Sequence, residues 1–142
     1  MATVVEKDGK FLLVKELENG KLVLNQPAGH LEPGEDLLEA ARRETLEETG
    51  WEVELSGLLG ISLYTAPANN VSYHRTCFAA KPVQHHPERE LDPDIDEVVW
   101  LSLEEMQQRS TEMRSPLVIP AVERYLTRPH YPLDIFHPAG SV

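Results

Sequence analysis

The segment Gly29–Trp51 constrains this chain more than any other part of its sequence. It opens as a loop rich in proline and glycine and then becomes a run with helical spacing. Apolar or small side chains at Leu38, Ala41 and Thr45 recur three and four residues apart, which places them on one face of a helix. We therefore expect a helix over Glu35–Thr49 that buries this face.

A second face of the expected helix is acidic. At about 100° per residue, Glu47 and Glu48 lie on either side of Glu44, so that three carboxylates share one face. Like charges at this spacing destabilise a helix, and carboxylates near its C-terminal end also oppose its dipole. Gly50 is a typical left-handed C-cap that would end the helix there. A solvated acidic surface is the simple alternative, but a bound divalent cation would resolve the conflict, with Mg²⁺ the natural candidate and Mn²⁺ a substitute.

This segment resembles the Nudix box, in which glycine, glutamate, Arg-Glu, Glu-Glu and a final glycine stand at fixed spacings. One position departs from the pattern, because Thr45 stands where an aliphatic residue is usual. The resemblance implies an α+β fold in which a Nudix-type mixed β-sheet is packed between helices as an α/β/α sandwich. The length of the chain and the absence of a composition break predict a single domain over residues 1–142, in which the box spans residues 29–51. The matching positions are Gly29, Glu35, Arg43, Glu44, Glu47, Glu48, Gly50 and Trp51.

The same resemblance implies a hydrolase that uses water to cleave a phosphoanhydride bond, with Arg43 orienting a glutamate. Glu44 would be either a metal ligand or the general base, and an acid of the loop at residues 92–97 could be the base instead. The residues alone suggest that Glu35 pairs with Arg42 or Arg43 and holds the loop on the helix. The metal ligands implied by the resemblance are the Gly29 carbonyl, Glu44, Glu47 and Glu48.

Three stretches, the first of which overlaps the start of the box, resemble the NudJ phosphatase branch of the Nudix family: Leu24–Glu32, Arg114–Val118 and Tyr131–Leu133. That branch implies a phosphatase that acts on nucleoside tri- and diphosphates and on hydroxymethylpyrimidine pyrophosphate and thiamine diphosphate. The alternatives are a Nudix pyrophosphatase for nucleotide sugars or dinucleoside polyphosphates, and a nucleotide-binding Nudix module without catalysis.

Four residues are candidates for contacts with the substrate: Gln26, Tyr73, Arg75 and Arg114. Tyr73 and Arg75 are two apart, so in a strand they point to the same face, where a ring and a cation could meet a base and a phosphate. A cross-strand pair at the surface explains them equally well. Arg114 precedes an expected helix start, a position that favours anions.

The rest of the chain alternates strands with turns and short helices. The pair Asp8-Gly9 predicts a hairpin and Asn19-Gly20 a second turn. A capping box begins a helix at Ser102, and a further helix is expected from Ser115-Pro116, with Ser115 as its cap. The tail at about 128–142 is expected to be flexible, and His85-His86 to lie in an exposed loop. Strands are expected over Ala2–Val5, Lys10–Glu16, Lys21–Leu24, Trp51–Tyr64, Asn70–Pro82 and Glu97–Leu101.

Composition limits the kinds of partner that this protein can bind. The formal net charge of −11 on 142 residues would repel a nucleic acid polymer, so a small phosphorylated molecule is the expected partner. The sequence contains neither a secretory signal nor an apolar run of membrane-spanning length, and Cys77 has no second cysteine. We expect a cytoplasmic protein without membrane contact, a monomer or small homo-oligomer, in which Cys77 is a buried hydrophobic residue.

Overall fold

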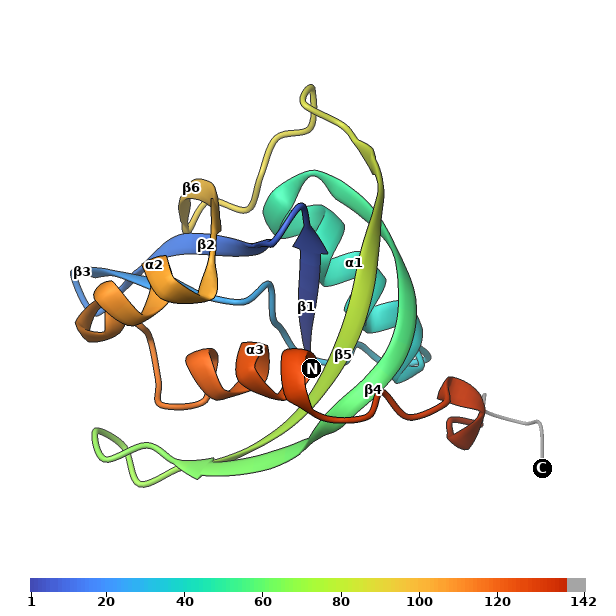
Figure 1. The fold of residues 1–142 in the computed structure, drawn as a ribbon. Coiled ribbons are helices and arrows are strands. Elements are labelled where there is room, and N and C mark those ends of the chain that lie inside the picture. Colours follow the sequence, from blue (N-terminus) through green and yellow to red (C-terminus); the bar gives the residue numbers. More distant parts are fainter. Residues whose placement is uncertain (138–142) are drawn as a thin grey trace.

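The computed structural model describes residues 1–137, which form one mixed sheet with helices on both sides (Figure 1). The helices are α1 (Leu37–Thr49), α2 (Leu103–Gln108) and α3 (Val118–Thr127), and two short 3₁₀ helices are η1 (Ser110–Glu112) and η2 (Leu133–Ile135). The strands are β1 (Ala2–Lys7), β2 (Lys10–Glu18), β3 (Lys21–Asn25), β4 (Trp51–Thr65), β5 (Ser72–His85) and β6 (Ile95–Leu101). None of the helices in this range combines the length and apolar character needed to cross a membrane.

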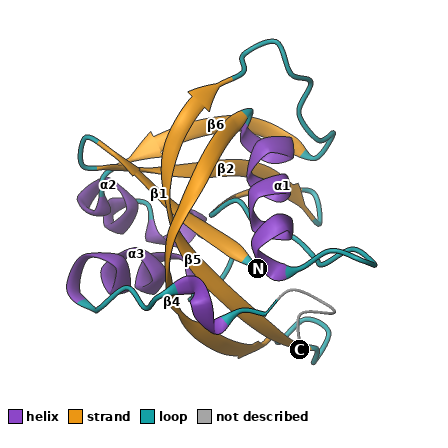
Figure 2. Ribbon diagram, turned by 90° about the vertical axis from the view of Figure 1, so that its right-hand side faces the viewer, coloured by secondary structure: helices purple, strands orange, loops and turns teal. Residues whose placement is uncertain are grey.

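The sheet has the order β3-β2-β1-β5-β4, and β6 pairs with β2. Strand β1 lies at the centre of this order. It runs parallel to β5 but antiparallel to β2, so the sheet is mixed. Figure 2 shows α1 on one side of the sheet and α2 and α3 on the other. The expected mixed sheet between helices is confirmed.

Alternation along the strands gives each side of the sheet its own core. In β5, Cys77 and Ala79 pack into the cluster that includes residues of α2 and α3, whereas Phe78 and Ala80 pack into the cluster that includes Ala41 of α1. This is the period of two expected for a strand buried on both faces. Cys77 is a buried free thiol, as expected, and burial raises its pKa to about 11.

Both turn predictions are confirmed by the backbone. Asp8 and Gly9 have φ values of 51° and 78°, and Asn19 and Gly20 have 49° and 76°. Two successive residues with positive φ are the signature of the tight hairpin turns that Asp-Gly and Asn-Gly favour. These turns fix the register of β1, β2 and β3.

The second long strand of the sheet extends farther than expected. β5 continues through Pro82 to His85, which lies opposite Trp51 in β4, and the His85 ring stacks on the Trp51 ring at a centroid distance of 4.7 Å. Pro82 is accommodated because it lies opposite Val53, next to a shift in strand register. The assignment of His85 to an exposed loop is therefore wrong, although its side chain is exposed.

The starts of two other elements also shift. β6 begins at Ile95, two residues earlier than expected, because its pairing with β2 starts at that residue. α3 begins at Val118 rather than after Ser115, so Pro116 precedes the helix. The Ser115 hydroxyl still accepts the N–H of Leu117 at 3.2 Å, but it caps a turn and not the helix itself.

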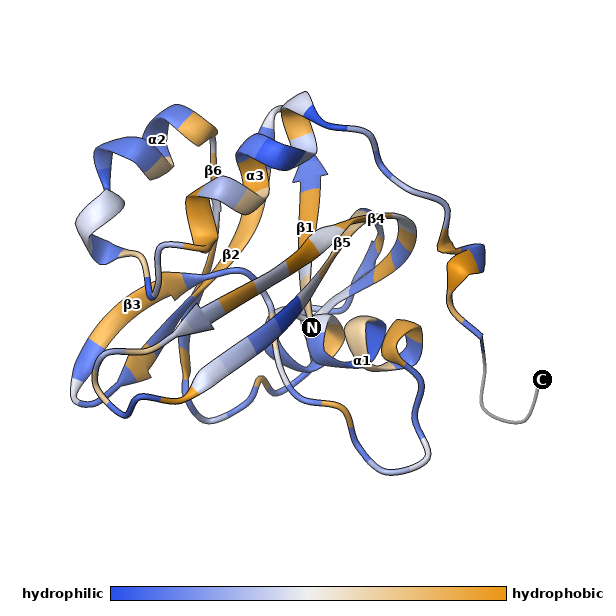
Figure 3. Ribbon diagram, turned by 90° about the horizontal axis from the view of Figure 1, so that it is seen from below, coloured by the Kyte–Doolittle hydropathy of each residue, from blue (hydrophilic) through white to orange (hydrophobic). Residues whose placement is uncertain are grey.

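The segment after α3 is partly ordered, in contrast to the expected flexible tail. Tyr131 exchanges two backbone hydrogen bonds with Leu58 of β4, at 2.8 and 2.9 Å. Leu133 and Phe136 then pack against the core on the α1 side, and Figure 3 shows the short helix η2 as mostly hydrophobic. The part of this prediction that concerns residues 138–142 lies outside the described residues.

Candidate functional site

The acidic helix α1 has well-formed ends. The Asp36 side chain accepts the Glu39 N–H at 2.8 Å, so the helix begins two residues later than expected, at Leu37. Gly50 has φ of 75° and its N–H bonds to the Leu46 carbonyl, which confirms the predicted left-handed C-cap. These ends fix where the acidic side chains point.

Thr45, the one departure from the box pattern, is buried on the inner face of α1. Its hydroxyl lies 2.8 Å from the Thr3 hydroxyl of β1 and also bonds to the Ala41 carbonyl at 2.7 Å. A buried hydroxyl needs such partners to offset its desolvation. The substitution is therefore accommodated by a second threonine across the helix–sheet contact, which local spacing could not reveal.

Arg43 joins four parts of the box. Its guanidinium donates to both oxygens of Glu35, at 2.6 and 2.9 Å, which confirms the expected pairing of the loop with the helix. It also reaches Glu44 at 2.8 Å and Glu47 at 3.2 Å, and the His30 carbonyl at 3.0 Å. The hydrogen bond with Glu35 raises the pKa of Arg43 and lowers that of Glu35. Arg43 thus fixes two of the three acids on the acidic face.

Glu48 differs from its neighbours because it is buried, with only 8% of its surface exposed. One carboxylate oxygen accepts the Ala28 N–H at 2.9 Å, which ties the loop after β3 to the helix. Burial raises the pKa of this carboxyl to about 8. A buried carboxylate without a cation is costly, and its repulsion from Glu16, Glu44 and Asp92 adds to that cost.

Gly29 lies directly against Glu44. A Cβ atom at this position would overlap the Glu44 carboxyl group, so only glycine allows the loop and the carboxylate to approach this closely. The Gly29 carbonyl, an expected metal ligand, accepts the amino group of Met1 at 2.9 Å. A carbonyl oxygen keeps a second lone pair for another ligand.

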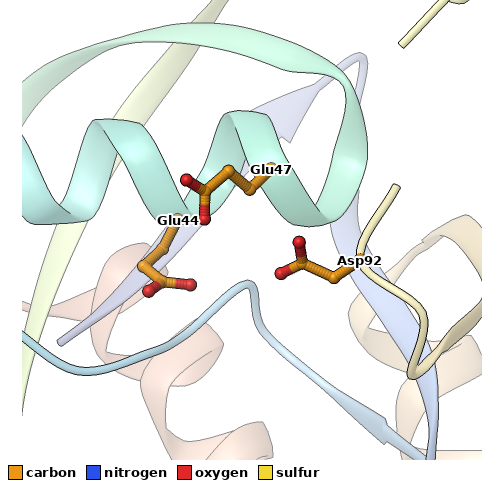
Figure 4. A group of neighbouring side chains, drawn as sticks. All are labelled: Glu44, Glu47 and Asp92. Atoms are coloured by element: carbon orange, nitrogen blue, oxygen red, sulfur yellow. The ribbon is translucent and has the colours of Figure 1, made fainter. Parts of the chain in front are cut away.

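Asp92 completes a cluster of three acids with Glu44 and Glu47 (Figure 4). One oxygen from each side chain lies within 4.8 Å of the other two. The N–H of Asp92 bonds to the Glu47 carbonyl at 3.3 Å, which holds the loop against the end of the helix. Asp92, the first acid of the loop at 92–97, thus lies beside the box. Glu48 belongs to the same acidic region, but its carboxylate is hydrogen-bonded to the Ala28 N–H.

The three clustered acids suit a divalent cation. Their donors are all carboxylate oxygens, the ligands that hard cations such as Mg²⁺ and Mn²⁺ prefer. Burial, followed by repulsion from Glu47 and Asp92, raises the pKa of Glu44 against the lowering effect of Arg43. A cation would remove this penalty, so the residues present fit such an ion.

A second polar network lies on the α3 side of the sheet, around Arg75 of β5. Its Nη2 atom donates to the side-chain oxygens of Asn25, at 2.9 Å, and Gln26, at 3.0 Å. Gln26 is buried and donates its own amide N–H to the Val118 carbonyl at 2.7 Å, which fixes the orientation of the amide. Gln26, a predicted substrate contact, is therefore placed to hold Arg75.

Arg75 has no carboxylate partner among residues 1–137. Its Nη1 atom is the one buried side-chain nitrogen or oxygen in that range without a hydrogen-bond partner. Burial lowers the pKa of Arg75. A buried donor left unpaired costs about 1–3 kcal/mol, and more when it is charged.

The other two predicted contacts have different surroundings. Arg114 pairs with the buried carboxylate of Glu16 at 2.7 Å and with Glu18 at 3.4 Å, so its charge is already neutralised. Tyr73 is exposed and lies opposite Tyr64, with its hydroxyl 3.2 Å from the Asn69 amide. Glu16 was not predicted as a site residue, because nothing near it in the sequence indicates its partner Arg114, 98 residues away.

Comparisons with known proteins agree on one family. The profile of the NUDIX domain matches residues 1–122. Phosphatase NudJ of Escherichia coli strain K12 is 42% identical over 135 residues, which are 95% of this chain and 87% of that protein.

Solved structures give the same result. A NUDIX hydrolase from Nitrosomonas europaea has 42% sequence identity and a TM-score of 0.93, covering 96% of this chain and 93% of that chain. An Ap4A hydrolase from C. elegans has 20% identity and a TM-score of 0.66, covering 88% of this chain and 90% of that chain. The second similarity concerns the fold alone.

Proposed function

The chain belongs to the NUDIX domain family and is a hydrolase of phosphoanhydride bonds, and from this premise we propose that it is a magnesium-dependent phosphatase. Its substrates would be nucleoside tri- and diphosphates together with hydroxymethylpyrimidine pyrophosphate and thiamine diphosphate. The similarity to phosphatase NudJ over 95% of the chain supports this choice. Mn²⁺ would substitute for Mg²⁺.

The convergence of Glu44, Glu47 and Asp92 carries the proposal. We assign the cation to these acids, with Glu48 and the Gly29 carbonyl as further ligands. When bound, the ion would neutralise the charge of the diphosphate and make the attacking water more acidic.

The chain's own residues supply the rest of the reaction. Arg43 holds Glu44 and Glu47 in place through its hydrogen bonds. A carboxylate accepts a proton from the water whose oxygen attacks phosphorus, and the bridging P–O bond breaks, which releases orthophosphate and the shortened product. We assign this role to Glu44 or Asp92, and the position of both side chains in the cluster supports the assignment.

Two other substrate classes are kept as alternatives, nucleotide sugars and dinucleoside polyphosphates. The Ap4A hydrolase shares the fold, but at 20% identity it gives no support for that substrate in this chain. A module that only binds nucleotides would not need the full set of acids, whereas this chain retains Glu44, Glu47 and Glu48.

The expected partner is a small phosphorylated molecule and not a nucleic acid polymer, which the formal charge of −11 would repel. We place the reaction in the cytoplasm, because the free buried thiol of Cys77 suits a reducing compartment. A monomer or small homo-oligomer remains our expectation for the assembly.

A phosphate-release screen tests the proposal. Purified protein with MgCl₂ is assayed against nucleoside di- and triphosphates, the two thiamine-pathway compounds, nucleotide sugars and dinucleoside polyphosphates. We expect orthophosphate from the first two groups and its loss on chelation with EDTA. Turnover confined to nucleotide sugars or dinucleoside polyphosphates would replace the proposed substrates, and turnover that survives chelation would overturn the metal assignment.

A further inference from the structure

We infer that Arg75 binds a phosphoryl group of the substrate, and that Asn25 and Gln26 are positioning residues that aim its guanidinium. The inference rests on the proposed function, because it concerns the phosphate chain of the same substrate. It separates Arg75 from Arg114, although both are predicted substrate contacts.

The first argument is the difference in charge compensation between the two arginines. Arg114 is paired with Glu16 and Glu18, whereas Arg75 is held only by the neutral amides of Asn25 and Gln26. Neutral amides orient a guanidinium without cancelling its charge. A half-buried cation held in this way retains its attraction for an anion.

The second argument is the unused edge of the guanidinium. Both amide oxygens bind Nη2, which leaves Nη1 buried and without an acceptor among residues 1–137. Such an unpaired donor in a native structure requires an explanation. A phosphoryl oxygen that approaches this edge would supply the missing acceptor, in the geometry that guanidinium groups use for phosphate.

The third argument is position. One segment, residues 25–29, serves both polar regions: Asn25 and Gln26 bind Arg75, whereas the Ala28 N–H binds Glu48. Ala28 follows Gln26 by two residues, which span at most about 7 Å of backbone. Arg75 is therefore beside the acidic site and outside its cluster of carboxylates, where the part of a phosphate chain that the cation does not bind would lie.

The test compares KM and kcat for the substrate that the screen identifies. Arg75→Gln is expected to raise KM at least about tenfold with a smaller change in kcat, and Arg75→Lys to recover part of the loss, because it keeps the charge but not the fork. Inorganic pyrophosphate as a competitive inhibitor should weaken in parallel. Arg128→Gln is the matched control, since it removes the same charge at the exposed end of α3.

Several outcomes would overturn the inference. It fails if Arg75→Gln leaves KM and pyrophosphate inhibition unchanged, or if Arg114→Gln alone reproduces the tenfold rise. If Arg75→Gln does not fold, Arg75→Lys provides the same test, and an unchanged KM in that variant counts against the inference. If the wild-type protein releases no phosphate from any compound, the proposed function fails instead, and calorimetric binding of pyrophosphate to wild type and Arg75→Lys still decides the role of Arg75.

Discussion

The acidic face of α1 and the network around Arg75 meet at the segment Asn25–Gly29, but they are assembled in opposite ways. Within the acidic face, Arg43 contacts Glu44 and Glu47, which are one and four residues away, and Glu35, which is eight residues away. In the second network, Arg75 contacts residues 49 and 50 positions away.

This difference separates two tasks. Apart from Asp92, the groups proposed to break the bond are encoded in one helix and its preceding loop, so sequence proximity alone keeps them together. The groups proposed to recognise the substrate come from separate strands, so each can change independently. Relatives that share a helix of this kind can therefore share a reaction and differ in substrate.

The largest expected effect comes from removing a charge from the acidic face of α1, whose residues are close together in the sequence. Glu47→Gln keeps the size of the side chain but removes a charge from the acidic cluster, and we expect kcat to fall at least about 100-fold for every substrate, more than changes beyond the ligand shell usually cost. Phosphate release measured with MgCl₂ gives the result. Glu39→Gln, the same exchange at an exposed position of α1, should leave kcat near that of the wild type. A loss limited to one substrate would contradict the division of tasks.

A smaller effect is expected at Asp92, the member of the cluster that the box does not encode. Asp92→Asn should lower kcat by about 10- to 100-fold, because a neutral amide neither balances a cation nor accepts a proton. Asp96→Asn, at an exposed position of β6, is the control. The pH profile of kcat then identifies the base: its acidic limb should disappear in Asp92→Asn or in Glu44→Gln, but not in both. If Asp92→Asn kept the wild-type kcat, Asp92 would have no part in the reaction, and the catalytic acids would all come from α1.

The smallest expected effect concerns stability without metal. The pKa of Glu48 is raised from 4.5 to about 8, so the folded state holds a proton that the unfolded state releases between these values. Stability should therefore fall as pH rises through that window, lowering Tm by roughly 5 °C between about pH 6 and pH 9 in EDTA. Scanning calorimetry measures the change. The same scans should show a smaller fall for Glu48→Gln, and a wild-type Tm that rises with pH would refute the assigned burial effect.

The fold was predictable wherever short-range signals decide it. Asp8-Gly9 and Asn19-Gly20 require positive φ and indicated both turns, and Gly50 indicated the end of α1. The boundaries that were missed depend on distant partners. His85 belongs to β5 because Trp51 pairs with it from the other strand, and Ile95 begins β6 because β2 extends far enough to pair with it.

The site divides in the same way. The acids of α1 and Arg43 could be predicted from helical spacing, since residues three and four apart share a face, whereas the place of Asp92 beside them could not. The surroundings of Arg75 and Arg114 could not, because each acceptor comes from another strand. Thr3 and Glu16 carry no local signal, and only the packed sheet shows that they face Thr45 and Arg114.

The pairing of Tyr131 with Leu58 also shows that the folded domain extends beyond α3. The family profile stops at residue 122, yet Leu133 and Phe136 contribute side chains to the core beneath α1. Trimming the gene to the matched range would remove both residues and open that core to water. The length that the family profile matches is thus shorter than the length that burial of the core requires, and recombinant boundaries should follow the second.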